Sequence, residues 1–146
     1  AMARRLGLRD IAILEDEGGF GLGAVGNFER PVSGEEAVAL VKERFGLRIL
    51  RCSSPVDRIE RVALCGGSGA SEIDAARAAG AQLYISADIS YHHFFTPEGF
   101  MIMDIGHFES EVEIVSILSS VISEKFPTFA VRISDNLGRS NPVRYF

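Results

Sequence analysis

The sequence predicts an α/β fold, with a mixed, partly parallel sheet and helices packed on it. From residue 60 onward the expected elements follow in the order strand, helix, strand, strand, helix, strand. That alternation is typical of sheets with at least some parallel pairs, because a helix carries the chain back to the same end of the sheet. The 146 residues are the size of one ordinary domain and can bury a hydrophobic core.

The expected strands are short apolar runs separated by polar or glycine-rich breaks. Between the first two runs, the glycines of residues 18–26 indicate an extended segment or hairpin rather than a helix. Pro127 precedes the last run and ends the helix before it. The predicted strands are 11–14, 47–52, 60–65, 82–86, 100–105 and 128–133.

Ser33 begins the first predicted helix. It is a favourable N-cap, and Glu36, three residues later, completes a capping box. Gly46 ends this helix. Further helices are expected to follow Ser71, to about residue 79, and to span 107–125, the latter with an apolar stripe that faces the core. The stripe consists of Ile114, Val115, Leu118, Val121 and Ile122.

The composition narrows the class of protein. A net charge of −5 argues against a broad nucleic-acid surface, whose affinity would rest on neutralising phosphates. No apolar stretch approaches the roughly 18–20 residues that span a bilayer, so no membrane partner is expected. Cys52 and Cys65 are expected to be reduced, buried and structural. We expect a cytoplasmic protein.

The first candidate site is the pair His107 and Glu111. If the helix that opens near His107 is regular, the two side chains stand one turn apart on the same face. An imidazole and a carboxylate at that spacing form a pair of metal ligands. The alternative is structural, since carboxylates in a first turn stabilise the helix dipole and a histidine after glycine can cap a helix.

A second candidate site follows the strand at 82–86, in the segment Asp88 to His93. Metal ligation, proton transfer or orientation of a neighbouring ligand are all chemically open to its aspartate and two histidines. The alternative is a loop whose histidines satisfy their own backbone. All three histidines of the chain fall between His92 and His107, and this clustering favours a functional role.

The third candidate is the glycine-rich segment between a strand and a helix, which comprises Gly66, Gly67, Ser68 and Gly69. Its backbone N–H groups could hold a phosphate or carboxylate. A tight turn that lets the helix approach the sheet is an equal alternative. The spacing matches neither a P-loop nor a dinucleotide fingerprint, and no Gly-x-Ser-x-Gly nucleophile elbow is present.

Four motifs follow one another along the chain: Cys65 to Ala70, Ser86 to His92, Asp104 to Glu111 and Asn141 to Phe146. Together they resemble the C-terminal half of the NIF-three-like family, whose members are homologues of a type 2 GTP cyclohydrolase I. The resemblance runs from about residue 20 to the C-terminus. It includes Gly21 to Gly26, which fits the family's entry into that half.

The resemblance implies a dinuclear metal centre. We expect zinc, manganese or iron in it, because these divalent ions accept an imidazole together with a carboxylate. His107 and Glu111 match the family's C-terminal metal ligands, and His92 matches a position that lines the same cleft, which implies a supporting or catalytic role. Two metals bridged by water would suit activation of a hydroxide for hydrolysis. The family's assemblies imply a homo-oligomer, or a separate N-terminal half as partner.

The chain departs from the family's pattern, because no paired-histidine motif precedes the segment at Gly21. Residues 1–20 are expected to be an arm or the remnant of an inserted domain, and residues 21–146 the C-terminal half. The expectation is a metal-binding, hydrolase-like half that is incomplete for catalysis alone. The alternatives are a non-enzymatic interaction or regulatory domain, and small phosphate-ligand binding at Gly66–Gly69.

Overall fold

A six-stranded mixed sheet forms the centre of the protein, whose computed structural model describes residues 1–145. Phe146, the last residue of the motif that starts at Asn141, lies outside the described residues. The strand order is β1-β2-β4-β5-β6-β3, with β4, β5 and β6 parallel and the other pairs antiparallel, which confirms the predicted α/β class. The strands are β1 Arg9–Asp16, β2 Gly21–Val32, β3 Arg51–Cys52, β4 Ile59–Ser68, β5 Leu83–Ala87 and β6 Met101–Asp104.

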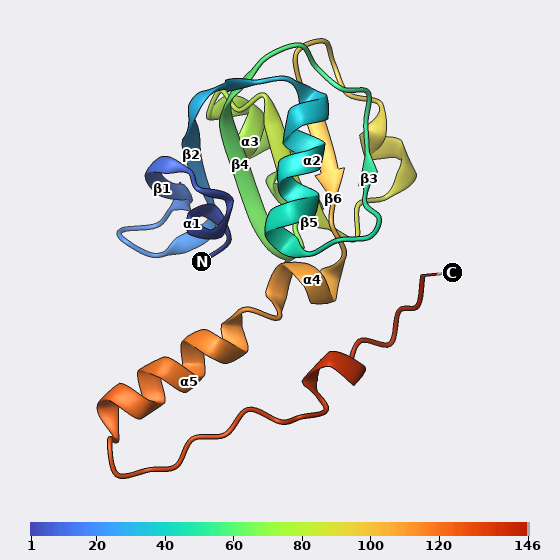
Figure 1. Ribbon diagram of the computed structural model, residues 1–146. Coiled ribbons are helices and arrows are strands. Elements are labelled where there is room, and N and C mark those ends of the chain that lie inside the picture. The colour runs from blue at the N-terminus through green and yellow to red at the C-terminus, as the bar shows by residue number, and fades with distance from the viewer. Residues whose placement is uncertain (146) are drawn as a thin grey trace.

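Helices cover both faces of this sheet (Figure 1). Successive side chains of a strand point to opposite faces, so Leu83 and Ile85 of β5 pack in the cluster with α2, while Tyr84 packs in the cluster with α3. The helices are α1 Met2–Leu6, α2 Gly34–Phe45, α3 Ile73–Ala78, α4 His107–Glu111 and α5 Ile114–Lys125, with short 3₁₀ turns η1 Ala70–Glu72, η2 Tyr91–Phe94 and η3 Leu137–Arg139.

Helix α2 begins with the capping box that the sequence predicts. The Glu36 amide donates to Ser33 Oγ at 3.1 Å, and the Ser33 amide donates to Glu36 Oε2 at 3.0 Å. At the other end Gly46 adopts a left-handed conformation, with φ 67°, as helix C-termini commonly require. Local sequence therefore determines both ends of this helix.

The structure corrects two of the expected strands and the expected burial of both cysteines. The strand expected at 47–52 forms only at Arg51–Cys52, where it pairs with β6. Residues 128–133 lie in no strand, because no described strand pairs with them. Cys52 is exposed on the edge strand and Cys65 is half-buried, so the expectation that both are buried is wrong.

The N-terminal segment contains a short helix that the sequence pattern does not indicate. Met2, Ala3 and Leu6 of α1 are buried in the same cluster as the α2 face, and β1 pairs with β2. Residues 1–20 thus pack on the main body. Their origin as the remnant of an inserted domain stays a prediction.

The long helix expected at 107–125 is broken into α4 and α5 around Val112 and Glu113. Helix α5 contains no buried residue, so the expectation that its apolar stripe faces the core is wrong. Figure 1 shows α5 extending away from the sheet and the tail after it turning back. The apolar spacing predicts an amphipathic helix but does not specify what covers it. Among the described residues, no helix is long and apolar enough to cross a membrane.

Candidate metal site at the carboxyl ends of the parallel strands

The candidate site lies where β5 and β6 end. Because these strands are parallel, with Ser86 opposite Asp104, their carboxyl ends meet at the same edge of the sheet, where open α/β folds place ligands. Asp88 follows β5 directly, and His107 opens α4 three residues after β6 ends. Residues nineteen positions apart in the sequence are thereby brought into contact.

His107 contacts a carboxylate through each ring nitrogen. Its Nδ1 lies 2.6 Å from Asp88 Oδ2, and its Nε2 lies 3.2 Å from Glu111 Oε2. All three side chains are about half-exposed, so solvent reaches the group. The structure thus places His107 and Glu111 one turn apart on one face, as their spacing predicts, and adds Asp88 on the opposite side of the ring.

This environment raises the pKa of His107 above its ordinary value of 6.5. The hydrogen bond to Asp88 is the largest cause, partial burial opposes it, and the negative charges of Glu111 and Asp88 add to the rise. Hydrogen bonds and opposite charges favour the protonated ring. Without a metal, the imidazolium form suits both contacts.

The end of β4 packs against the side chains of His107 and Glu111. Gly67 has φ 64°, and a Cβ at this position would overlap with Glu111 Oε1, so only glycine fits there without moving the carboxylate. The Gly67 amide donates to Ser110 Oγ at 2.8 Å, and Ser110 Oγ donates to the His107 carbonyl at 2.8 Å. These bonds tie the first turn of α4 to the sheet.

The same contacts revise the predicted glycine loop. Gly66, Gly67 and Ser68 belong to β4, and only Gly69 lies in the connection to η1. Since the Gly67 amide already has Ser110 as an acceptor, it is not directed at a ligand. Anion binding at Gly66–Gly69 stays a prediction.

A buried carboxylate holds the two site-bearing turns together. Asp104, at the end of β6, accepts from the Ile89 amide and from the Gly106 amide, each at 3.0 Å, and also pairs with Arg51. One of these amides follows Asp88 and the other precedes His107. Asp104 therefore sets the spacing between the two turns, a role that the sequence pattern does not reveal.

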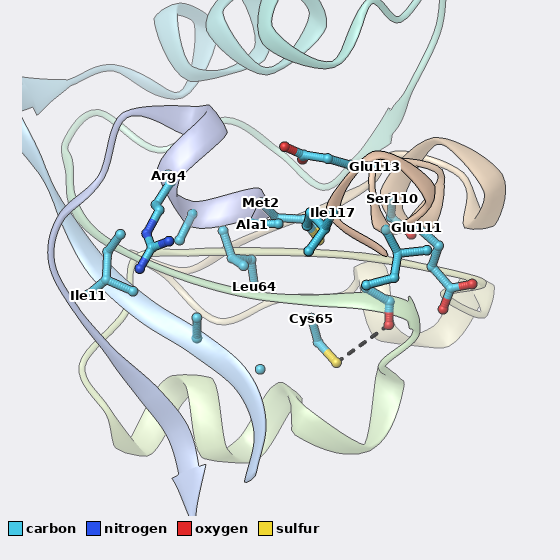
Figure 2. Close-up of a pocket in the computed structure, with 15 residues that line it drawn as sticks. Ala1, Met2, Arg4, Ile11, Leu64, Cys65, Ser110, Glu111, Glu113 and Ile117 are labelled. Carbon is cyan, nitrogen blue, oxygen red and sulfur yellow. Dashed lines mark hydrogen bonds between the residues drawn. The ribbon is translucent and has the colours of Figure 1, made fainter. Parts of the chain in front are cut away.

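Two cavities flank α4. One, of about 540 Å³, is lined by Arg51, Asp88, His107, Glu111 and tail residues around Asn141. The other, of about 660 Å³, lies between the N-terminal segment and the start of α5. Met2, Ile117 and Glu111 are among the residues that line it (Figure 2). Glu111 lines both cavities, so small molecules can approach it from two sides. Volumes of this size are usual for ligand pockets.

The C-terminal tail contributes to the site in a way that spacing alone does not show. Asn141 Nδ2 donates to Glu109 Oε1 at 3.0 Å, which fastens the tail motif to α4. His92 and His93 are exposed on η2 and are absent from the described lining of either cavity beside Glu111. The role assigned to His92 stays a prediction.

The pair His107–Glu111 fits a single metal ion as part of its ligand set. Metal–nitrogen and metal–oxygen bonds of about 2.0–2.2 Å place two donors on one ion roughly 3–3.5 Å apart, and Nε2 and Oε2 are 3.2 Å apart. Within residues 1–145, however, no group of three or more His, Cys, Asp and Glu side chains is arranged to hold a metal. Metal ligation by His107 and Glu111 stays a prediction.

A family profile and two named relatives place this chain in the same protein family. Residues 1–139 match the sequence profile of Duf34/NIF3 (NGG1p interacting factor 3). A Lactococcus lactis protein named GTP cyclohydrolase 1 type 2 homolog is 35% identical, over 94% of this chain and 53% of its own length. A Nostoc protein of the same name is 34% identical, over 75% of this chain and 44% of its own. The chain thus spans about half the length of these relatives.

Solved structures show the same fold. A hypothetical protein of Staphylococcus aureus superposes with a TM-score of 0.88 at 19% identity, over 99% of this chain and 62% of its own. Reduced HcgD from Methanocaldococcus jannaschii gives a TM-score of 0.68 at 27% identity, over 86% of this chain and 50% of its own. The first match covers nearly the whole chain, so the projecting α5 and tail are part of the shared fold.

Proposed function

The chain belongs to the Duf34/NIF3 (NGG1p interacting factor 3) family, and we propose that it supplies two ligands to the divalent metal centre of a hydrolase. The observation that carries the proposal is the pair His107 Nε2 and Glu111 Oε2, which lie 3.2 Å apart on one helix face at the end of the parallel strands. Imidazole and carboxylate together accept zinc, manganese or iron.

The residues around the pair have separable tasks in this proposal. His107 and Glu111 hold the metal, and Gly67 leaves room for the Glu111 carboxylate. Ser110 fixes the turn that carries both ligands. A bound metal would supply Lewis acidity and would lower the pKa of a water molecule, which is the chemistry that hydrolysis needs. The cavity lined by Arg51, Asn141, His107 and Glu111 would admit the substrate.

We propose that the remaining metal ligands come from a second copy of the chain or from a separate N-terminal half. Two donors alone give weak binding, whereas structural and catalytic zinc sites use three or four protein ligands. Two relatives are named as homologues of GTP cyclohydrolase 1 type 2, so GTP is the first substrate to assay in the completed assembly.

Metal content tests this proposal directly. Zinc is titrated into purified, metal-free protein, and the titration yields the stoichiometry and the dissociation constant without a desalting step that would remove weakly bound metal. His107→Ala and Glu111→Gln should each lose the bound zinc while keeping the circular dichroism spectrum. His93→Ala, which removes an exposed histidine, is the matched control and should retain it. His92→Ala, measured in the same series, tests the supporting role assigned to that residue.

Zinc bound equally by wild type and His107→Ala would refute the assignment of the ligand. A wild-type chain that binds no zinc would favour the alternative function, a non-enzymatic interaction domain. One observation supports that alternative: Ile114, Leu118 and Val121 of α5 are each at least 50% exposed, and apolar surface of this kind commonly marks a protein interface.

A further inference from the structure

Asp88 combines an unusual backbone conformation with a short contact to the candidate metal ligand. Its φ is 54°, and among the described residues Asp10, with φ 51°, is the only other non-glycine residue with a positive φ. Aspartate tolerates this left-handed conformation better than most side chains, but still at a cost. Its Oδ2 lies 2.6 Å from His107 Nδ1.

We propose that Asp88 is a positioning residue that determines which nitrogen of His107 binds the metal. The Asp88 carboxylate accepts a hydrogen bond from the Nδ1–H group of His107, so the proton stays on Nδ1. The lone pair of Nε2 is then free and directed toward the side where Glu111 lies. Histidine ligands commonly donate their second N–H to a carboxylate, which fixes the tautomer and the ring orientation and makes the ligand more basic. This inference rests on the proposed metal-binding function.

The surrounding contacts show that the position of Asp88 is built into the fold. The next residue, Ile89, is 1% exposed, and its amide donates to the buried Asp104 carboxylate, while its carbonyl accepts from Arg51 at 2.9 Å. These bonds hold the turn that places Asp88 in its left-handed conformation. The Asp88 side chain itself is 52% exposed.

Stability does not explain this arrangement. An ion pair between half-exposed side chains contributes little to folding, because water screens it and the side chains lose rotamer freedom. The left-handed backbone of Asp88 opposes that small gain. Among residues 1–145, the polar contact of the Asp88 side chain is to His107, a candidate metal ligand. An unfavourable backbone conformation combined with this contact fits a role in orienting that ligand.

Three variants separate the carboxylate from the backbone effect. Asp88→Asn keeps an acceptor oxygen and tolerates the same φ, whereas Asp88→Gly removes the acceptor and relaxes the backbone. Asp10→Gly relaxes the equivalent backbone conformation on β1, away from the site. Zinc affinity should fall about 10–100-fold in Asp88→Gly, should fall less in Asp88→Asn, and should be unchanged in Asp10→Gly.

A second readout needs no metal. In ¹⁵N spectra of metal-free protein with a singly protonated ring, the His107 signals should report the Nδ1–H tautomer in wild type and a mixture of tautomers in Asp88→Gly. His107→Gln identifies the signals among the three histidines. A merely structural role for Asp88 would leave the tautomer unchanged.

The two readouts distinguish failure of this inference from failure of the proposed function. Unchanged zinc affinity and an unchanged tautomer in Asp88→Gly would overturn the role of Asp88, even if zinc binds through His107. Absence of zinc binding in wild type would overturn the metal function, and the tautomer would then decide alone whether Asp88 orients the ring.

Discussion

Replacing Gly67 with alanine adds one methyl group that should both lower the stability of the fold and displace the carboxylate of Glu111. The backbone at Gly67 has φ 64°, and the new Cβ would overlap with Glu111 Oε1 and lie 3.3 Å from His107 Cε1. The left-handed conformation costs alanine about 1–2 kcal/mol, of which the reduced entropy of the unfolded chain offsets about 0.4–1 kcal/mol. The net destabilisation is therefore about 1 kcal/mol.

The overlap with Glu111 affects the site rather than the fold. Its carboxylate ends a flexible, half-exposed side chain that can swing away at little cost in stability, but this movement separates it from His107 Nε2. Zinc affinity should consequently fall by at least about 10-fold, the lower end of the loss seen when ligand orientation is disturbed.

Gly80→Ala is the matched control. Gly80 has φ 76°, and a Cβ there meets no atom within 4 Å, so this variant carries the backbone cost alone. Both variants should lose about 3 °C in melting temperature by calorimetry, whereas only Gly67→Ala should lose zinc affinity by titration. Equal zinc affinity in the two variants would show that the place of Glu111 beside His107 is irrelevant to metal binding.

Further outcomes follow from the described contacts and from the predicted anion site. Ser33→Ala removes the N-cap of α2 and should lower the free energy of unfolding in urea by about 1 kcal/mol. The Ser33 backbone amide, with Arg30, holds the pKa of Glu36 below its ordinary value of 4.5. The stability that this carboxylate contributes is present above pH 4.5 and is lost as the pH falls through the lowered value, so the difference in unfolding free energy between Glu36→Gln and wild type should shrink in acid. Asp104→Ala leaves two amides without their acceptor and should cost about 2–3 kcal/mol, with a smaller loss in Asp104→Asn; equal losses would show that the carboxylate does not hold the turns. Inorganic phosphate tests the predicted anion site at Gly66–Gly69: binding there should raise the melting temperature of the protein, and an unchanged melting temperature would refute the site.

Local sequence predicted those elements whose cause is local. The capping box of Ser33 and Glu36 appears as expected, since both partners lie within one turn. The apolar runs of β4, β5 and β6 could be recognised because strands of a parallel sheet are buried on both faces and therefore consist of nearly continuous apolar residues. The one-turn spacing of His107 and Glu111 likewise follows from helix geometry.

The failures concern segments whose structure depends on a distant partner. The apolar stripe of α5 was expected in the core, yet the described chain leaves it exposed, because periodicity defines a face without defining its neighbour. Residues 128–133 have strand-like composition but no adjacent strand in the described sheet, and a strand exists only through its pairing.

The sequence by itself determined the α/β class, the capped helix and the pairing of an imidazole with a carboxylate on one helix turn. Only the tertiary structure decided that Asp88 contacts His107 and that Asp104 fixes both turns. Only the tertiary structure also shows that Gly67 makes room for Glu111. These contacts join separate strands, and they arise from the parallel register of β5 and β6, which is set by packing of the whole sheet rather than by any local pattern.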